Sequence, residues 1–298
     1  MKGVKMQVRE QPVIWLQGAG CSGCSISLMN SVSPSIRNLL LDEIVPGQHI
    51  NLLFHPTLMA ASGELAIEVM LDRDRKTDYL LVLEGSIPTA EGGIFATVGE
   101  EKGKPITLYS RFKELARRAI AVVAVGTCAS FGGIPAAKPN PTGSKSAGGV
   151  LEEENISVPY INIPGCPPHP DWFIGTIADI LLNGIPSGEK LDDLKRPKSI
   201  YGKLIHENCP RRPFFDEGKF AHNFGEEGCL YELGCKGPFT YSDCPIRHWN
   251  GGVNWPVDAG APCNGCTEPI FPDISGPFYQ KISRWDSFKV KVQSDKER

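Results

Sequence analysis

Short hydrophobic runs recur through the first 185 residues, and stretches with helical periodicity lie between them. The runs are rich in Val, Ile and Leu and too short for buried helices, so they predict β-strands buried on both faces. The expected strands are residues 13–17, 50–55, 79–83, 120–125 and 160–163. Helices are expected at residues 25–29, 62–74, 112–119 and 170–182, where apolar residues fall on one face.

The alternation of strands and helices predicts an α/β fold. We expect an open, doubly wound, flavodoxin-like parallel sheet over residues 8–185. After about Asn183 the periodic segments disappear, and Pro and Gly become dense. A loop-rich segment of this length needs something other than a sheet to hold it together. Residues 186–298 are therefore expected to form a second domain in which bound metal supplies folding energy.

Composition and charge exclude several classes of protein. The 298 residues are 41% hydrophobic and 22% charged, which is typical of a folded domain. The net charge of −3 gives no reason to expect nucleic acid or an anionic membrane as a partner. No apolar run approaches the roughly 20 residues of a transmembrane helix.

The N-terminal residues contain no apolar region and no paired arginines, so no export signal is visible. The expected location is therefore the cytoplasm. A periplasmic or membrane-associated location is the alternative if a twin-arginine leader has been removed.

Ten cysteines are the unusual feature of the composition. Cys21 and Cys24 follow the first expected strand, Cys128 follows the fourth, and Cys166 follows the fifth. The carboxyl ends of parallel strands share one edge of a sheet, so these four thiols are expected to converge there. Four thiolates suit a [4Fe–4S] cluster. The neighbouring glycines would let the backbone approach such a cluster and turn its amides toward the sulfurs.

Other interpretations of these cysteines remain open. A Cys-x-x-Cys pair alone fits a redox dithiol, and four thiolates also bind zinc. Structural zinc sites usually use two short pairs of ligands, whereas Cys128 and Cys166 are single and distant in sequence. A disulfide framework is unexpected in a chain of this size without a secretion signal. The spacing therefore favours an iron–sulfur cluster.

Glu84 ends the third expected strand and so should lie at the same edge. Its carboxylate has two interpretations of equal weight. It is either an accessory group near the cluster, which relays protons or contacts a partner, or a helix cap or surface acid.

The C-terminal region holds two further groups of ligands. His206, Cys209, Cys229 and Cys235 make four, and Cys244, Cys263 and Cys266 make three. Three thiolates suit a [3Fe–4S] cluster, while the Cys3His set alone also fits structural zinc. Surface or packing roles are expected for the other histidines, which are His49, His55, His169, His222 and His248.

Taken together, the motifs resemble the small subunit of nickel–iron hydrogenases. They run in the order C-S-G-C, V-G-T-C, I-P-G-C-P-P-H-P, H-x-x-C, C-L-Y-E-L-G-C-K-G-P, C-P and W-P-V-D-A-G-A-P-C-N-G-C. Each motif alone is weak, but the combination is specific. The resemblance covers most of the chain, from about Val13 to Phe271.

The resemblance implies three clusters in a line. Cys21, Cys24, Cys128 and Cys166 match the ligands of the proximal [4Fe–4S] cluster. Cys244, Cys263 and Cys266 match those of the medial [3Fe–4S] cluster, and His206, Cys209, Cys229 and Cys235 match those of the distal [4Fe–4S] cluster.

Four further positions refine the resemblance. Pro256 stands where some relatives carry a fourth medial cysteine, which implies the three-iron form. Gly23 and Gly133 stand where oxygen-tolerant relatives carry additional cysteines, which implies an ordinary proximal cluster. Gly20 departs from the family, because many relatives have Glu before the first cysteine.

The resemblance also implies the activity. The family oxidises dihydrogen reversibly at a nickel–iron centre, which belongs to a large partner subunit. This chain would relay electrons from that centre to an external acceptor near the distal cluster. An obligate heterodimer is expected, or a dimer of heterodimers. The alternatives are a subunit of a larger respiratory-type electron-transfer complex and a zinc-stabilised scaffold with no redox role.

Overall fold

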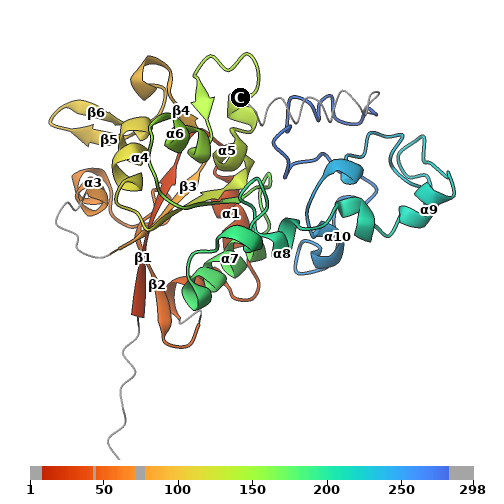
Figure 1. Cartoon of the computed structure of the whole chain (residues 1–298), viewed down its shortest axis with the longest axis horizontal. Helices are drawn as coiled ribbons and strands as arrows, with labels where there is room; N and C mark the ends of the chain where they lie inside the picture. The colour runs from red at the N-terminus through yellow and green to blue at the C-terminus, as the bar shows by residue number, and fades with distance from the viewer. Residues whose placement is uncertain (1–8, 43–44, 72–77, 282–298) are drawn as a thin grey trace, which may run out of the picture. The chain divides into compact units, whose positions relative to one another are not determined.

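The computed structural model describes residues 9–42, 45–71 and 78–281. The chain divides into two compact units, residues 1–195 and residues 196–298. The first contains most of the regular secondary structure, and the second is built largely from turns (Figure 1).

A five-stranded parallel sheet forms the centre of the first unit and confirms the predicted fold class. Its order, β2-β1-β3-β7-β9, is the flavodoxin-like order in which the second strand lies outside the first. The strands are β1 Arg9–Gln17, β2 Gln48–Phe54, β3 Leu80–Glu84, β7 Ala121–Val125 and β9 Tyr160–Ile163. Every residue of β3 and β7 is buried, which explains their continuous apolar sequence.

Helices cover both faces of this sheet (Figure 1). On one face, Leu81 and Leu83 pack in a core with residues of α3, α4, α5 and α6. On the other face, the Trp15 ring lies 5.2 Å from the ring of Phe173 in α7. The helices of this unit are α1 Gly23–Met29, α2 Ile36–Leu41, α3 Gly63–Leu71, α4 Leu108–Ala116, α5 Gly126–Phe131, α6 Ala147–Glu153 and α7 Pro170–Asn183.

Some elements differ from the sequence prediction. Helix α4 begins four residues before the expected start, because the Thr107 hydroxyl caps it by accepting from the Ser110 amide. Residues 72–74 of the expected helix 62–74 lie outside the described residues. The hairpin of β5 Thr97–Glu101 and β6 Lys104–Thr107 was not predicted, since its strands are polar and largely exposed.

The second unit has only short helical elements within its described residues, in keeping with the predicted loop-rich region. They are α8 Lys198–Tyr201, η4 Ile205–Asn208, α9 Arg212–Asp216, η5 Gly237–Phe239 and α10 Cys244–Arg247. A small core of Cys229, Tyr231 and Phe239 packs against partly buried phenylalanines. Across the described parts of both units, no helix has the length and apolar character needed to cross a membrane.

The sheet core gives a first test. Leu81 is fully buried in β3, whereas Leu65 of α3 is 66% exposed. We expect Leu81→Ala to lower the free energy of unfolding by about 2–5 kcal/mol through lost burial and a cavity. The matched change Leu65→Ala should alter it by less than about 0.5 kcal/mol. Denaturant unfolding of the two variants compares them, and equal effects would contradict this assignment of the core.

Candidate metal centres

The structure brings four of the predicted ligands together at the carboxyl edge of the sheet. Cys21 and Cys24 lie where β1 passes into α1, Cys128 lies in α5 after β7, and Cys166 follows β9. The thiolates of Cys128, Cys21 and Cys166 all act on Cys24 electrostatically. The four sulfurs therefore form one group, beside the point where the strand order reverses between β1 and β3.

Burial makes this group unfavourable as a set of bare thiolates. Burial, Glu84 and the three neighbouring thiolates together raise the pKa of Cys24 well above its usual range. Burial, followed by the Cys166 thiolate, raises the pKa of Cys128 to about 11. A bound metal would reverse this preference, because cations stabilise coordinated thiolates. The chemistry of this donor set therefore fits iron or another thiophilic metal.

Two glycines explain how the backbone comes so close to these sulfurs. A Cβ atom on Gly126 would lie 2.4 Å from Cys24 Sγ, and one on Gly133 would lie 2.9 Å from Cys128 Sγ. Both residues have positive φ, +87° and +55°, which other residues rarely adopt. Any side chain at either position would displace a ligand sulfur.

Glu84 proves to be a buried hub rather than a surface acid. Its Oε1 atom accepts hydrogen bonds from the amides of Cys24, at 3.0 Å, and Ser25, at 3.1 Å. Its Oε2 atom accepts from the Trp15 indole at 3.2 Å, the Gln17 amide at 3.0 Å and the Ser25 hydroxyl. The carboxylate therefore caps the start of α1 and fixes the backbone of Cys24.

His55 extends this network. Its Nδ1 accepts from the Thr57 amide at 3.3 Å, so Nε2 carries the proton that is donated to Ser25 Oγ at 3.2 Å. The ring is almost fully buried and packs 5.0 Å from the Trp15 ring. Burial lowers the pKa of His55 to about 4, although Glu84 opposes the shift. The imidazole is therefore neutral at physiological pH.

The second unit gathers the predicted Cys3His set around one small pocket. His206, Cys209, Cys229 and Cys235 all line it. Burial, followed by the Arg212 charge, lowers the pKa of His206, which keeps its imidazole in the neutral form that binds metals. The His206 ring packs edge-on against Phe215, with their centroids 4.6 Å apart.

The three remaining cysteines form a neighbouring group. The thiolates of Cys266 and Cys244 both raise the pKa of Cys263, after burial and Cys235. The Cys263 amide donates to Cys235 Sγ at 3.4 Å, which joins this group to the Cys3His set. Pro256 is exposed, and its carbonyl accepts from the Ala261 amide at 2.8 Å.

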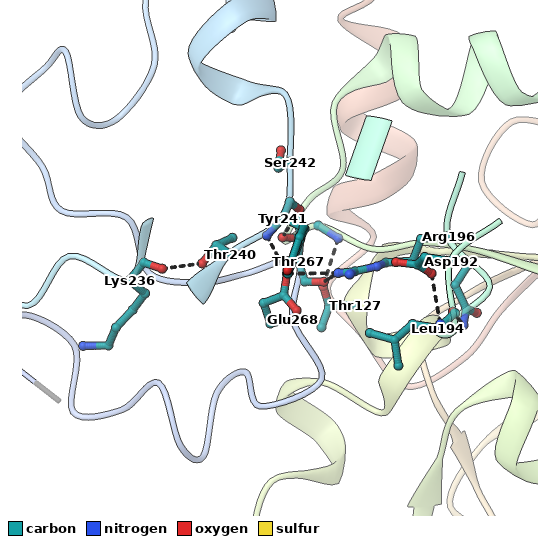
Figure 2. A network of polar contacts seen from close by, with 12 residues as sticks. Thr127, Asp192, Leu194, Arg196, Lys236, Thr240, Tyr241, Ser242, Thr267 and Glu268 are labelled. Atoms are coloured by element: carbon teal, nitrogen blue, oxygen red, sulfur yellow. Dashed lines mark hydrogen bonds and ion pairs between the residues drawn. The ribbon is translucent and has the colours of Figure 1, made fainter. Parts of the chain in front are cut away.

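A buried ion pair anchors the loop that carries Cys263 and Cys266. Arg196 donates to Glu268 at 3.0 Å and to the Thr267 carbonyl at 3.1 Å (Figure 2). Glu268 Oε1 also accepts a hydrogen bond from the Tyr241 amide at 2.7 Å. This network ties the loop to the segment that precedes Cys244.

None of the ten cysteines forms a disulfide, and all ten lie in the described residues. Sequence reasoning missed the roles of Ser25, His55 and Lys236 around the predicted ligands. Ser25 and Lys236 each carried one signal, since they directly follow the predicted ligands Cys24 and Cys235. His169 has the packing role that was expected, because it is buried and accepts from the Asp171 amide at the start of α7.

Comparison with known families matches both units. One family model describes the C-terminal part of the small subunit of NiFe/NiFeSe hydrogenases, and it matches residues 201–279. The model for the NADH ubiquinone oxidoreductase 20 Kd subunit matches residues 21–180.

Individual relatives match nearly the whole chain. The small subunit of the periplasmic [NiFeSe] hydrogenase of Desulfomicrobium baculatum is 46% identical, over 91% of this chain and 87% of its own. The small subunit of the periplasmic [NiFe] hydrogenase of Solidesulfovibrio fructosivorans is 43% identical, over 90% of this chain and 81% of its own. A crystal structure of the reduced, active Ni-Fe-Se hydrogenase of Desulfomicrobium baculatum has a chain with a TM-score of 0.85 and 47% identity. The match covers 92% of this chain and 100% of that one.

The expected cytoplasmic location is wrong. Relatives that are 41–46% identical to this chain are periplasmic hydrogenase small subunits. The expectation depended on the lack of a visible export signal, and that lack carries no information about where the folded protein works.

The Glu84 hub predicts the effect of a neutral substitute. Glu84→Gln replaces a carboxylate oxygen by an amide donor that faces other donors, so it should lower the free energy of unfolding by about 1–3 kcal/mol. Iron bound by the first unit should fall as Cys24 loses its anchor. Metal analysis and denaturant unfolding test this, with exposed Glu64→Gln as the control. Normal iron content and stability in Glu84→Gln would contradict the role of the hub.

His55 predicts a dependence of stability on pH. Its pKa of about 4 lies below the usual value of 6.5, so between these values the unfolded chain binds a proton that the folded chain does not. The contribution of His55 to stability is present above pH 6.5 and is lost as the pH falls toward 4. His55→Gln should reduce the slope of the free energy of unfolding against pH between about pH 4 and pH 6.5. Exposed His222→Gln should leave the slope unchanged, and equal slopes in both variants would refute the prediction.

Proposed function

Because this chain belongs to the family of nickel–iron and nickel–iron–selenium hydrogenase small subunits, we propose that its three ligand groups hold three iron–sulfur clusters in the order implied by that family. The chain is the electron-transfer subunit of an oxidoreductase that acts on dihydrogen, and its partner is a hydrogenase large subunit. The nickel–iron centre belongs to that partner, so this chain supplies the conduction path and not the site of hydrogen cleavage.

The first group would hold the proximal [4Fe–4S] cluster through Cys21, Cys24, Cys128 and Cys166. The observation that carries this proposal is the gathering of four thiols from the ends of three strands at one sheet edge. Glycine approach to Cys24 and Cys128 supports it, because backbone amides near sulfur tune a cluster. Gly23 and Gly133 are consistent with the ordinary proximal form.

The Cys3His set would hold the distal [4Fe–4S] cluster, with His206 as its one imidazole ligand. The pocket that these four side chains line supports the proposal. The three-thiol group of Cys244, Cys263 and Cys266 would hold the medial [3Fe–4S] cluster, since proline at position 256 offers no ligand atom. When bound, these clusters supply one-electron redox chemistry.

Residues of this chain also shape the route that electrons would take between the clusters. The Cys263 amide and Cys235 Sγ connect the medial and distal groups through one hydrogen bond, which offers a short bonded route between them. Glu84 would act as an accessory residue near the proximal cluster, where its carboxylate holds the Cys24 amide in place.

The family also suggests the setting in which the chain works. We place it in a heterodimer in the periplasm, with an external electron acceptor docking near the distal group. A dimer of such heterodimers is the higher assembly that we propose.

The two alternatives fit less well. The match to the respiratory 20 Kd subunit ends at residue 180, so it leaves the seven ligands of the second unit without a role. Structural zinc sites usually use two short pairs of ligands, whereas Cys128 and Cys166 are single and distant in sequence.

Metal analysis of the purified two-subunit enzyme tests the proposal. We expect about 11 iron ions in the clusters of this chain, accompanied by acid-labile sulfide. Low-temperature EPR of the oxidised enzyme should show a [3Fe–4S] signal that disappears on reduction. Zinc in place of iron, or the lack of any three-iron signal, would refute the cluster assignment.

A further inference from the structure

A buried lysine lies between the two ligand groups of the second unit. Lys236 directly follows Cys235 and is only 2% exposed. Its ammonium donates to the carbonyls of Gly234, at 2.8 Å, and Gln280, at 2.7 Å. An ammonium held this far from water needs compensation for the hydration that it loses.

Backbone contacts tie Lys236 to both groups. Its amide donates to the Cys263 carbonyl at 2.7 Å, while the Cys263 amide donates to Cys235 Sγ at 3.4 Å. Its own carbonyl accepts from the Thr240 hydroxyl at 2.7 Å (Figure 2). Lys236 is thus the backbone link between one ligand of the distal group and one ligand of the medial group.

The charge of Lys236 has no carboxylate partner among the described residues. Burial lowers the pKa of the ammonium, and the thiolates of Cys235 and Cys263 oppose that shift. Lys236 is bonded to Cys235 along the chain and hydrogen-bonded to Cys263 through its amide, so one cysteine of each group adjoins the lysine.

We propose that Lys236 is a positioning residue for electron transfer, the shared counter-charge that raises the reduction potentials of the medial and distal clusters together. The inference rests on the proposed function. Each reduction adds one electron, which hydrogen oxidation in the partner subunit supplies, and Lys236 neither gains nor loses a proton or a bond. A fixed cation stabilises the more negative, reduced state of a nearby cluster.

Redox titration of the two-subunit enzyme, followed by EPR, tests this role. In Lys236→Met, the equilibrium constant for reduction should fall about tenfold for the medial cluster and about tenfold for the distal cluster. For a one-electron couple this lowers each reduction potential by about 59 mV. Lys236→Arg keeps the charge and should restore most of the shift. The proximal potential serves as an internal reference, and exposed Lys198→Gln in α8 is the matched control.

The outcomes separate cleanly. Unshifted medial and distal potentials in Lys236→Met overturn the role of Lys236 and leave the proposed function standing. If Lys236→Met loses these clusters, their retention in Lys236→Arg supports the counter-charge, whereas their loss from both variants overturns it. A lack of the three-iron signal in the unsubstituted enzyme overturns the proposed function, and the role of Lys236 with it.

Discussion

Thiolates cannot be buried side by side without cations, and both units are organised around this constraint. In the first unit, burial and mutual repulsion raise the pKa of Cys24 and Cys128, so the bare group favours neutral thiols. In the second unit, Cys263 is subject to the same forces. The polypeptide therefore specifies where sulfur stands, while the bound metal supplies the charge that makes the arrangement favourable. Glu84 holds the Cys24 backbone in place, although its negative charge adds to the repulsion on the Cys24 thiolate.

Much of the fold was predictable because strands buried on both faces of a sheet have continuous apolar sequences. The apolar runs at 79–83 and 120–125 correspond to strands with every residue buried, and no polar face blurs their pattern. The sequence offered no such signal for the β5–β6 hairpin, whose exposed strands need not be apolar. Helix α6 was also missed, because two glycines near its start lower its helix propensity and a Ser146 cap compensates for them.

The gathering of the predicted ligands was foreseeable from the sequence, but the residues around them were not. Cysteine after a strand end is a chemical signal that survives in the sequence, and it led to the four thiols at one sheet edge. His55 carries no such signal, since its role depends on a strand pairing that brings β1 beside β2. Glu84 was found by its position at a strand end, yet its five donors could be counted only in three dimensions.

The hydrogen bond from the Cys263 amide to Cys235 Sγ has a consequence for how the enzyme matures. The loop that carries Cys235 and the loop that carries Cys263 do not order independently, because ordering one of them positions a cysteine of the other. The entropy of loop closure is then lost once for both sites rather than twice. We therefore infer that ordering one ligand group favours ordering of the other, so that the two groups of the second unit assemble as one unit.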